Sequence, residues 1–114
     1  MTHQCAVDVV DSTGAVRVRV SGEVDMACAP ELLDTLLAAD VPSGGTLVLD
    51  LAGVTFMDST GIGALLEAHR QREAVGVALA VVEVPPLIAK MLRMTGVDSY
   101  LVVSPATEGL VPEP

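Results

Sequence analysis

The chain turns from strand to helix within Phe56-Met57-Asp58-Ser59-Thr60-Gly61-Ile62-Gly63. A short apolar run, Leu47-Val48-Leu49-Asp50-Leu51, comes before this stretch, and a helix-like pattern follows it. We therefore expect Ser59 at a helix N-terminus, capping the helix through its oxygen. Unpartnered backbone N–H groups and the positive end of the helix dipole meet there, so an oxygen-rich anion on Ser59 is tolerated. With Asp58 beside it and almost no base nearby in sequence, Ser59 is more typical of a phosphate acceptor than of a nucleophile.

The periodicity around this stretch predicts an α/β fold, with a mixed sheet of about five strands and three helices in the order ββαβαβαβ. The expected strands are residues 7–10, 15–20, 46–50, 77–82 and 100–103, the third being central and the last lying at an edge. The expected helices begin near Pro30, Ser59 and Pro86, and the second runs to about residue 74. We expect one domain over residues 1–105 and a flexible tail over residues 106–114.

Single side chains can also be placed by this pattern. Arg17 and Arg19 are predicted on the opposite strand face from the neighbouring valines, and Gly96 after the end of the third helix. His69 falls on the apolar side of the second helix. Its solvent-facing side is predicted to hold Arg70, Arg72 and Glu73.

Composition excludes several classes of function. The 114 residues are 51% hydrophobic, and 15 acidic against 6 basic residues give a net charge of -9. A nucleic-acid-binding protein needs a basic face, so this charge argues against that class. No apolar run approaches the roughly 18 residues that span a bilayer, and no targeting segment is visible, so we expect a cytoplasmic protein that does not bind membranes.

The two cysteines, Cys5 and Cys28, stand apart from each other and from any Cys/His cluster. Isolated thiols suit a reducing compartment, although the sequence leaves a single bridge open. No cofactor or metal site is indicated.

Four segments together resemble a STAS domain of the anti-sigma-factor antagonist family. They are Ser21-Gly22-Glu23-Val24-Asp25 with Ala29-Pro30-Glu31-Leu32, then Leu47-Val48-Leu49-Asp50-Leu51, the stretch 56–63, and Leu92-Arg93-Met94-Thr95-Gly96-Val97. Two features depart from the family pattern. Cys28 stands where the family often has Thr, and only residues 106–114 remain where it commonly has a further helix.

The resemblance implies a non-enzymatic switch in transcription regulation. Such a protein binds an anti-sigma factor that is also a serine kinase, and so frees the sigma factor. Phosphorylation of the serine matching Ser59 ends the binding, and a serine phosphatase restores it. The kinase partner, not this chain, uses ATP and magnesium.

For the binding surface, we expect an acidic rim that attracts a basic partner, and apolar contact from the first helical turn. The residues assigned to partner binding are Glu23, Asp25, Asp58, Ser59, Thr60, Gly61, Ile62 and Gly63. The apolar stripes are accounted for by covering one sheet, which favours a monomer.

Two other functions fit parts of the sequence. An esterase is the enzymatic alternative, since Ser59 lies between a strand and a helix, but Met57 occupies the position where a nucleophile elbow needs glycine. STAS-like domains also serve as accessory subunits of transporters and in stress-signalling complexes. The sequence does not separate that role from anti-sigma antagonism.

Overall fold

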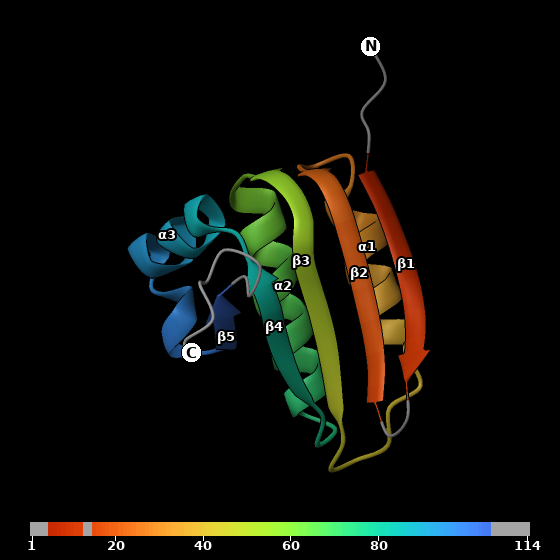
Figure 1. Cartoon of the computed structure of the whole chain (residues 1–114). Helices are drawn as coiled ribbons and strands as arrows, with labels where there is room; N and C mark the ends of the chain where they lie inside the picture. The colour runs from red at the N-terminus through yellow and green to blue at the C-terminus, as the bar shows by residue number, and fades with distance from the viewer. Residues whose placement is uncertain (1–4, 13–14, 106–114) are drawn as a thin grey trace, which may run out of the picture.

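The computed structural model describes residues 5–12 and 15–105, which form one five-stranded sheet. The strands lie in chain order: β1 (Cys5–Ser12), β2 (Ala15–Val24), β3 (Thr46–Met57), β4 (Ala78–Val84) and β5 (Val102–Pro105) (Figure 1). β1 is antiparallel to β2, and the other neighbours are parallel. The mixed sheet, the central third strand and the edge position of the last strand are therefore confirmed. The predicted tail, residues 106–114, lies outside the described residues.

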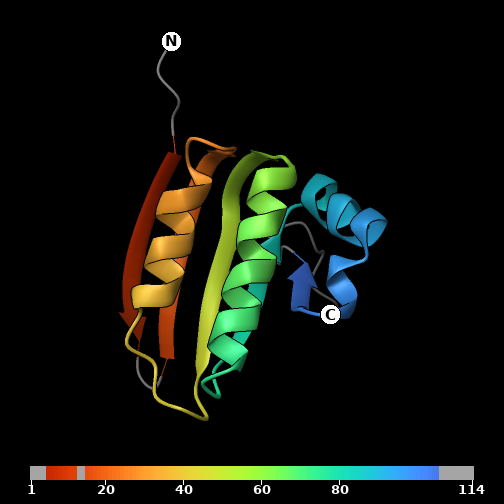
Figure 2. The same ribbon diagram turned by 180° about the vertical axis from the view of Figure 1, so that it is seen from behind.

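The helices are α1 (Ala29–Ala38), α2 (Ser59–Glu73) and α3 (Pro86–Thr95), and a short 3-10 turn, η1 (Val97–Ser99), follows α3. The predicted order of strands and helices is confirmed. α1 and α2 lie side by side over one face of the sheet, and α3 lies beyond β4 near β5 (Figure 2). Gly96 ends α3 in the left-handed conformation, with φ of 78°, as expected of the residue that terminates a helix.

The covered face of the sheet holds the core. Alternate residues of the three middle strands point toward the helices and are buried, because side chains alternate between the two faces of a strand. They meet the apolar sides of α1, α2 and α3. The largest fully buried side chains are Leu32, Leu36, Leu47, Leu49, Leu51, Met57, Leu65, Leu79, Ile88 and Leu92.

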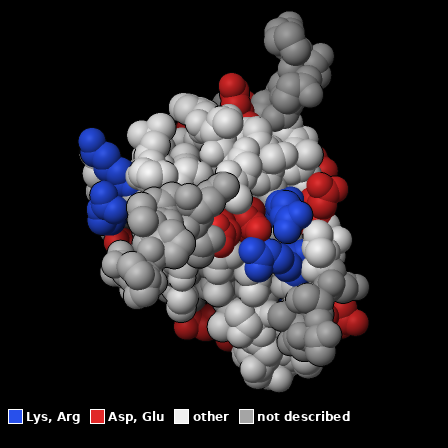
Figure 3. Space-filling view, in the orientation of Figure 1, with Lys and Arg blue, Asp and Glu red and all other residues white. Residues whose placement is uncertain are grey.

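The opposite face of the sheet carries a charge cluster on β2 and β3. Asp50 is only 3% exposed, and its carboxylate accepts hydrogen bonds from Arg17 at 2.7 and 3.1 Å. Arg19 lies 3.5 Å from the same oxygen, and the Ala52 N–H donates to the other one. Burial alone raises the pKa of Asp50, but these hydrogen bonds and the two arginines together hold it below its ordinary value. Figure 3, which views this face, shows basic and acidic side chains next to each other.

Several predicted boundaries were wrong. β3 continues seven residues beyond residue 50, because its parallel pairing with β2 extends to Val24 and Met57 through two irregularities in register. β5 starts two residues later than predicted, because η1 occupies residues 97–99.

The prediction for Arg72 was also wrong. This residue is buried, not solvent-facing, and its guanidinium donates to the carbonyl oxygens of Leu37 at 2.8 Å and Ala39 at 3.0 Å. A side chain predicted to be solvated therefore joins the end of α2 to the end of α1.

Candidate functional site

The first turn of α2 is capped by Asp58 and not by Ser59. The Asp58 carboxylate accepts hydrogen bonds from the Thr60 N–H at 3.0 Å, from the Gly61 N–H at 3.2 Å and from the Thr60 hydroxyl. The hydrogen bond from the Thr60 hydroxyl is the main reason that the pKa of Asp58 lies below its ordinary value. The predicted cap is therefore displaced by one residue, because Asp58 has the extended backbone of an N-cap and Ser59 is already helical.

Ser59 lies exposed as the first residue of α2. Among the described residues, no hydrogen-bond partner of its hydroxyl is found. Since Asp58 already satisfies two N–H groups of the first turn, a phosphate on Ser59 does not find those donors free, contrary to our expectation. The Ser59 oxygen is nevertheless accessible to a modifying enzyme.

The next residues of α2 differ in burial: Gly61 and Ile62 are buried, and Gly63 is exposed. A Cβ atom on Gly61 would meet Met57, and both the carbonyl oxygen and the side chain of Val24, at 2.7–2.9 Å, so Gly61 permits close packing of α2 on the sheet. Ile62 is 7% exposed and belongs to the core. The expectation that Ile62 offers apolar contact to a partner was therefore wrong. Gly63 is exposed, and a Cβ atom there would have nothing within 4 Å.

The acidic residues gather at one edge of the sheet because β2 and β3 are parallel and end together. Val24 pairs with Met57, and the Asp58 N–H donates to the Val24 carbonyl at 3.2 Å, which brings the turn after β2 beside the start of α2. Glu23 is exposed and pairs in register with Phe56, which is itself 45% exposed. Glu23, Asp25 and Asp58 thus lie at the strand ends that lead into α1 and α2, as expected.

This edge is acidic without basic residues close in sequence. Between Arg19 and Arg70 the chain contains no Lys or Arg, while eight acidic residues fall in that interval. Arg70 is eleven residues beyond Ser59 on α2, which is roughly 16 Å along a helix. A phosphate on Ser59 therefore adds charge to a region that is already negative.

The structure shows a surface feature that sequence reasoning missed. A groove of about 380 Å³ runs between the first turns of α1 and α2, and its lining is almost wholly apolar. It is lined by Met26, Ala29, Pro30, Leu33, Thr60, Gly63, Ala64 and Glu67. We call these eight residues the α1–α2 groove. Each helix contributes some of the apolar lining residues, but the width of the groove depends on how α1 packs against α2, which the sequence does not show.

The geometry does not support the esterase alternative. His69 is ten residues after Ser59 on the same helix, so the two lie roughly 15 Å apart along its axis. Its Nε2 lies 3.7 Å from a carboxylate oxygen of Glu73, away from the serine.

Among residues 5–12 and 15–105, no group of three or more His, Cys, Asp or Glu side chains could hold a metal. In the same residues, no helix is both long and apolar enough to span a membrane.

Comparison with known sequences gives consistent matches. A family model described as "Mlab, STAS domain" matches residues 7–104. The anti-sigma-B factor antagonist of Bacillus subtilis is 27% identical over 103 residues, covering 90% of this chain and 94% of that protein. The one from Staphylococcus aureus is 28% identical over 91 residues, covering 80% and 84%.

Solved structures share the fold. An anti-sigma factor antagonist from Mycobacterium paratuberculosis aligns with a TM-score of 0.73 at 27% identity, covering 93% of this chain and 90% of that one. A sulfate transporter family protein from Wolinella succinogenes also gives 0.73, at 22% identity, covering 87% and 83%. The second likeness concerns the fold alone, so similar architecture occurs in proteins of both kinds.

Proposed function

Because the chain belongs to the STAS domain family, we propose that the edge around Ser59 is a partner-binding surface and that the protein is an anti-sigma-factor antagonist. The observation that carries the proposal is an exposed serine at the start of α2, flanked by an acidic rim and by the α1–α2 groove. The curated relatives named as anti-sigma-B factor antagonists match most of the chain and support this function. The partner is an anti-sigma factor with serine kinase activity.

The groove explains how an apolar contact can form although Ile62 is buried. Met26 is 73% exposed at one wall, and Gly63 leaves one position of the other wall without a side chain. A glycine inside a helix is less stable than alanine, and here there is room for alanine. We infer that the space over Gly63 receives an apolar side chain of the partner, while the rim of Glu23, Asp25 and Asp58 attracts its basic residues.

Phosphorylation of Ser59 ends the binding in this proposal. The phosphate adds about -1.5 to -2 charges beside Asp58, whose carboxylate already occupies the N–H groups of the first turn. The basic residues of the partner are matched to the rim carboxylates in this proposal, so the added charge is desolvated in the complex without a cation of its own, which costs several kcal/mol. Each 1.4 kcal/mol is about tenfold in affinity, so we expect a loss of a hundredfold or more. A serine phosphatase reverses the modification.

The test is a binding titration with the anti-sigma factor kinase from the same organism. Ser59→Ala should bind normally but resist phosphorylation by the kinase with ATP, and Ser59→Asp should fold but bind at least a hundredfold more weakly. Ser43→Asp is the matched control. Ser43 is an exposed serine at the opposite end of the molecule, where Gly44 bonds to Gly76 beyond the end of α2. The Ser43→Asp variant should bind the anti-sigma factor with the affinity of the wild type.

Two outcomes would reject parts of this proposal. Full affinity of Ser59→Asp contradicts the electrostatic account. Recovery of membrane transporter subunits, and not of an anti-sigma factor, by Ser59→Ala from a lysate favours the accessory-subunit alternative.

A further inference from the structure

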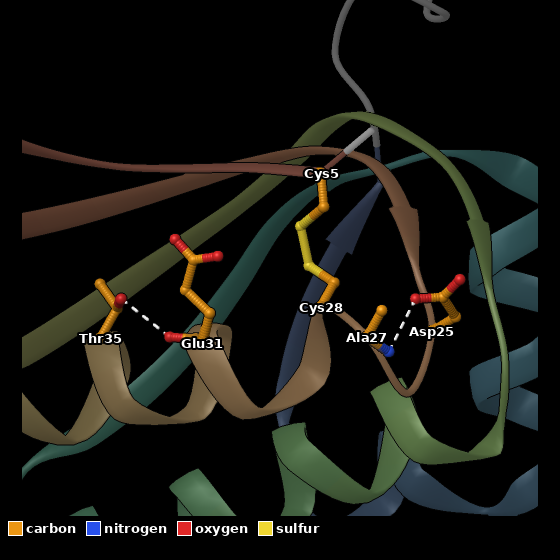
Figure 4. Close-up of a disulfide and its surroundings, with 6 residues drawn as sticks. All are labelled: Cys5, Asp25, Ala27, Cys28, Glu31 and Thr35. Carbon is orange, nitrogen blue, oxygen red and sulfur yellow. Dashed lines mark hydrogen bonds between the residues drawn. A yellow bond between two sulfur atoms is a disulfide. The ribbon is translucent and has the colours of Figure 1, made fainter. Parts of the chain in front are cut away.

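A disulfide joins the start of β1 to the start of α1. It links Cys5 and Cys28, whose Cα atoms are 6.0 Å apart, within the range that disulfides span (Figure 4). Cys28 is 1% exposed and Cys5 is half-buried. The sequence did not exclude a disulfide between these cysteines, and the fold brings the two residues together because α1 packs across β1 and β2.

The bridge is attached to the turn that leads into α1. Cys28 is the N-cap of α1 but makes no side-chain capping bond. Asp25 organises the turn instead: its carbonyl oxygen accepts from the N–H groups of Cys28 at 3.0 Å and Ala29 at 2.8 Å, and its carboxylate accepts from Ala27 at 3.0 Å. Figure 4 shows the turn between the bridge and Asp25.

The same turn forms part of the proposed binding surface. Met26 in this turn is exposed and lines the α1–α2 groove together with Thr60, the neighbour of Ser59. β1, at the other end of the bridge, is an edge strand that pairs with β2. The disulfide therefore connects one wall of the groove to the edge of the sheet.

We propose that the Cys5–Cys28 pair is a redox element that sets the affinity of this surface for its partner. This inference rests on the proposed function. In the oxidised form the bridge holds the turn 25–28, and with it Met26, in the position that completes the groove. In the reduced form the turn loses its link to β1 and keeps only the local hydrogen bonds of Asp25, so it is less ordered, and ordering it again on binding lowers the affinity.

The chemistry needs a dithiol reductant. A reductant thiolate attacks the more exposed sulfur, that of Cys5, and the Cys5–Cys28 bond breaks to release the Cys28 thiolate. The second reductant thiol then attacks the mixed disulfide and releases Cys5. Two electrons and two protons pass to this chain, which ends with two thiols, and the reductant ends as a disulfide.

The experiment compares the oxidised full-length chain with the same chain reduced by dithiothreitol, each state verified by thiol alkylation and mass spectrometry. Binding to the anti-sigma factor should weaken about three- to tenfold on reduction, as expected for ordering one or two side chains or a short turn. Cys5→Ser should match the reduced wild type in both conditions, because it cannot form the bridge and leaves the buried Cys28 in place.

Amide hydrogen exchange tests the same idea without the partner. The N–H groups of Ala27, Cys28 and Ala29 should exchange faster after reduction, while those of Thr60 and Gly61, capped by Asp58, should not change. Failure to bind the anti-sigma factor in either state rejects the proposed function, and the exchange data then still decide whether the bridge controls the turn. Equal affinity in both states, equal exchange in both states, or failure of the bridge to form under mild oxidation overturns the redox element.

Discussion

The two helices on the covered face of the sheet are held at their ends by different means. α2 is capped by its own neighbour in sequence, Asp58, and carries Arg70 and Arg72 in its last turn, where cations are favourable. α1 has no side-chain cap at its start and no basic residue in its last turn. Its start is bridged to Cys5, and its end is bonded by Arg72 from α2.

This difference bears on function. The proposed phosphorylation site lies on the helix whose ends are formed locally, so charge can be added at Ser59 without releasing contacts between distant parts of the chain. The start of α1 is held by local hydrogen bonds to Asp25 and also by the distant Cys5, and it lies on the other side of the same groove. The α2 wall of the groove is thus suited to phosphorylation, and the α1 wall to control through its link to a distant strand.

The largest effect is expected where α2 supports α1. Arg72→Ala removes two charged hydrogen bonds and leaves two partly buried carbonyl groups without these donors, so we expect the free energy of unfolding to fall by about 2–4 kcal/mol. Chemical denaturation measures this. Arg70→Ala is the control, because Arg70 is exposed and pairs with Glu67 of its own helix. An equally small change for both variants contradicts the role of Arg72 at the end of α1.

Replacing the two glycines of α2 by alanine should change the stability of the protein in opposite directions. Gly61→Ala forces a Cβ atom against Val24 and Met57, and such overpacking costs about 1–3 kcal/mol. Gly63→Ala has open space and should stabilise the helix by about 0.5–1 kcal/mol. Thermal unfolding distinguishes the two.

The affinity for the partner gives a second test of Gly63. If the space over Gly63 receives a partner side chain, the more stable Gly63→Ala variant should bind the anti-sigma factor about tenfold more weakly, corresponding to a lost contact of roughly 1.4 kcal/mol. Unchanged affinity, measured by isothermal titration calorimetry, would mean that the partner does not approach this point of the groove.

A smaller effect is expected from the cap of α2. Asp58→Ala leaves the Thr60 and Gly61 N–H groups without their acceptor, and the melting temperature should fall by about 4–8 °C. Asp58→Asn keeps a capping oxygen and should fall less. Equal losses for the two variants would show that the charge, and not the hydrogen bonds, stabilises the start of α2.

Acid should weaken the start of α2 and leave the start of α1 unchanged. The pKa of Asp58 is lower in the folded chain than the ordinary 3.8, so its contribution to stability is complete above about pH 4 and is lost as the pH falls through the folded value. The amides of Thr60 and Gly61 should then lose protection, while those of Cys28 and Ala29, which bond to a backbone carbonyl, should not. Hydrogen exchange corrected for its intrinsic pH dependence measures this, and Asp58→Asn should abolish the change.

Features that depend on neighbouring residues could be predicted from the sequence. The second helix was expected over residues 59–74 and is found over Ser59–Glu73, because its apolar period and its start signal are local. The third strand is central, as predicted from its nearly continuous apolar run. That run is typical of a strand covered on both sides, but α1 and α2 cover one face of β3 (Figure 2) and the opposite face carries the charge cluster of Arg17, Arg19 and Asp50. Ser59 and the acidic rim could be placed at one edge because parallel strands end together.

Features that depend on packing between elements could not be predicted. Ile62 was expected to offer apolar contact to a partner, but it is buried in the core, because Gly61 lets α2 pack closely on the sheet. Arg72 was predicted to face solvent, and only the proximity of α1 supplies the carbonyl groups of Leu37 and Ala39 for its guanidinium to bind.

The order of the elements and the position of the serine at the start of α2 could therefore be read from the chain alone, because both follow from local periodicity and chain direction. The α1–α2 groove and the joining of Cys5 to Cys28 depend on tertiary packing. Each brings together residues from separate elements, and the distance between elements depends on how side chains far apart in the sequence fill the core.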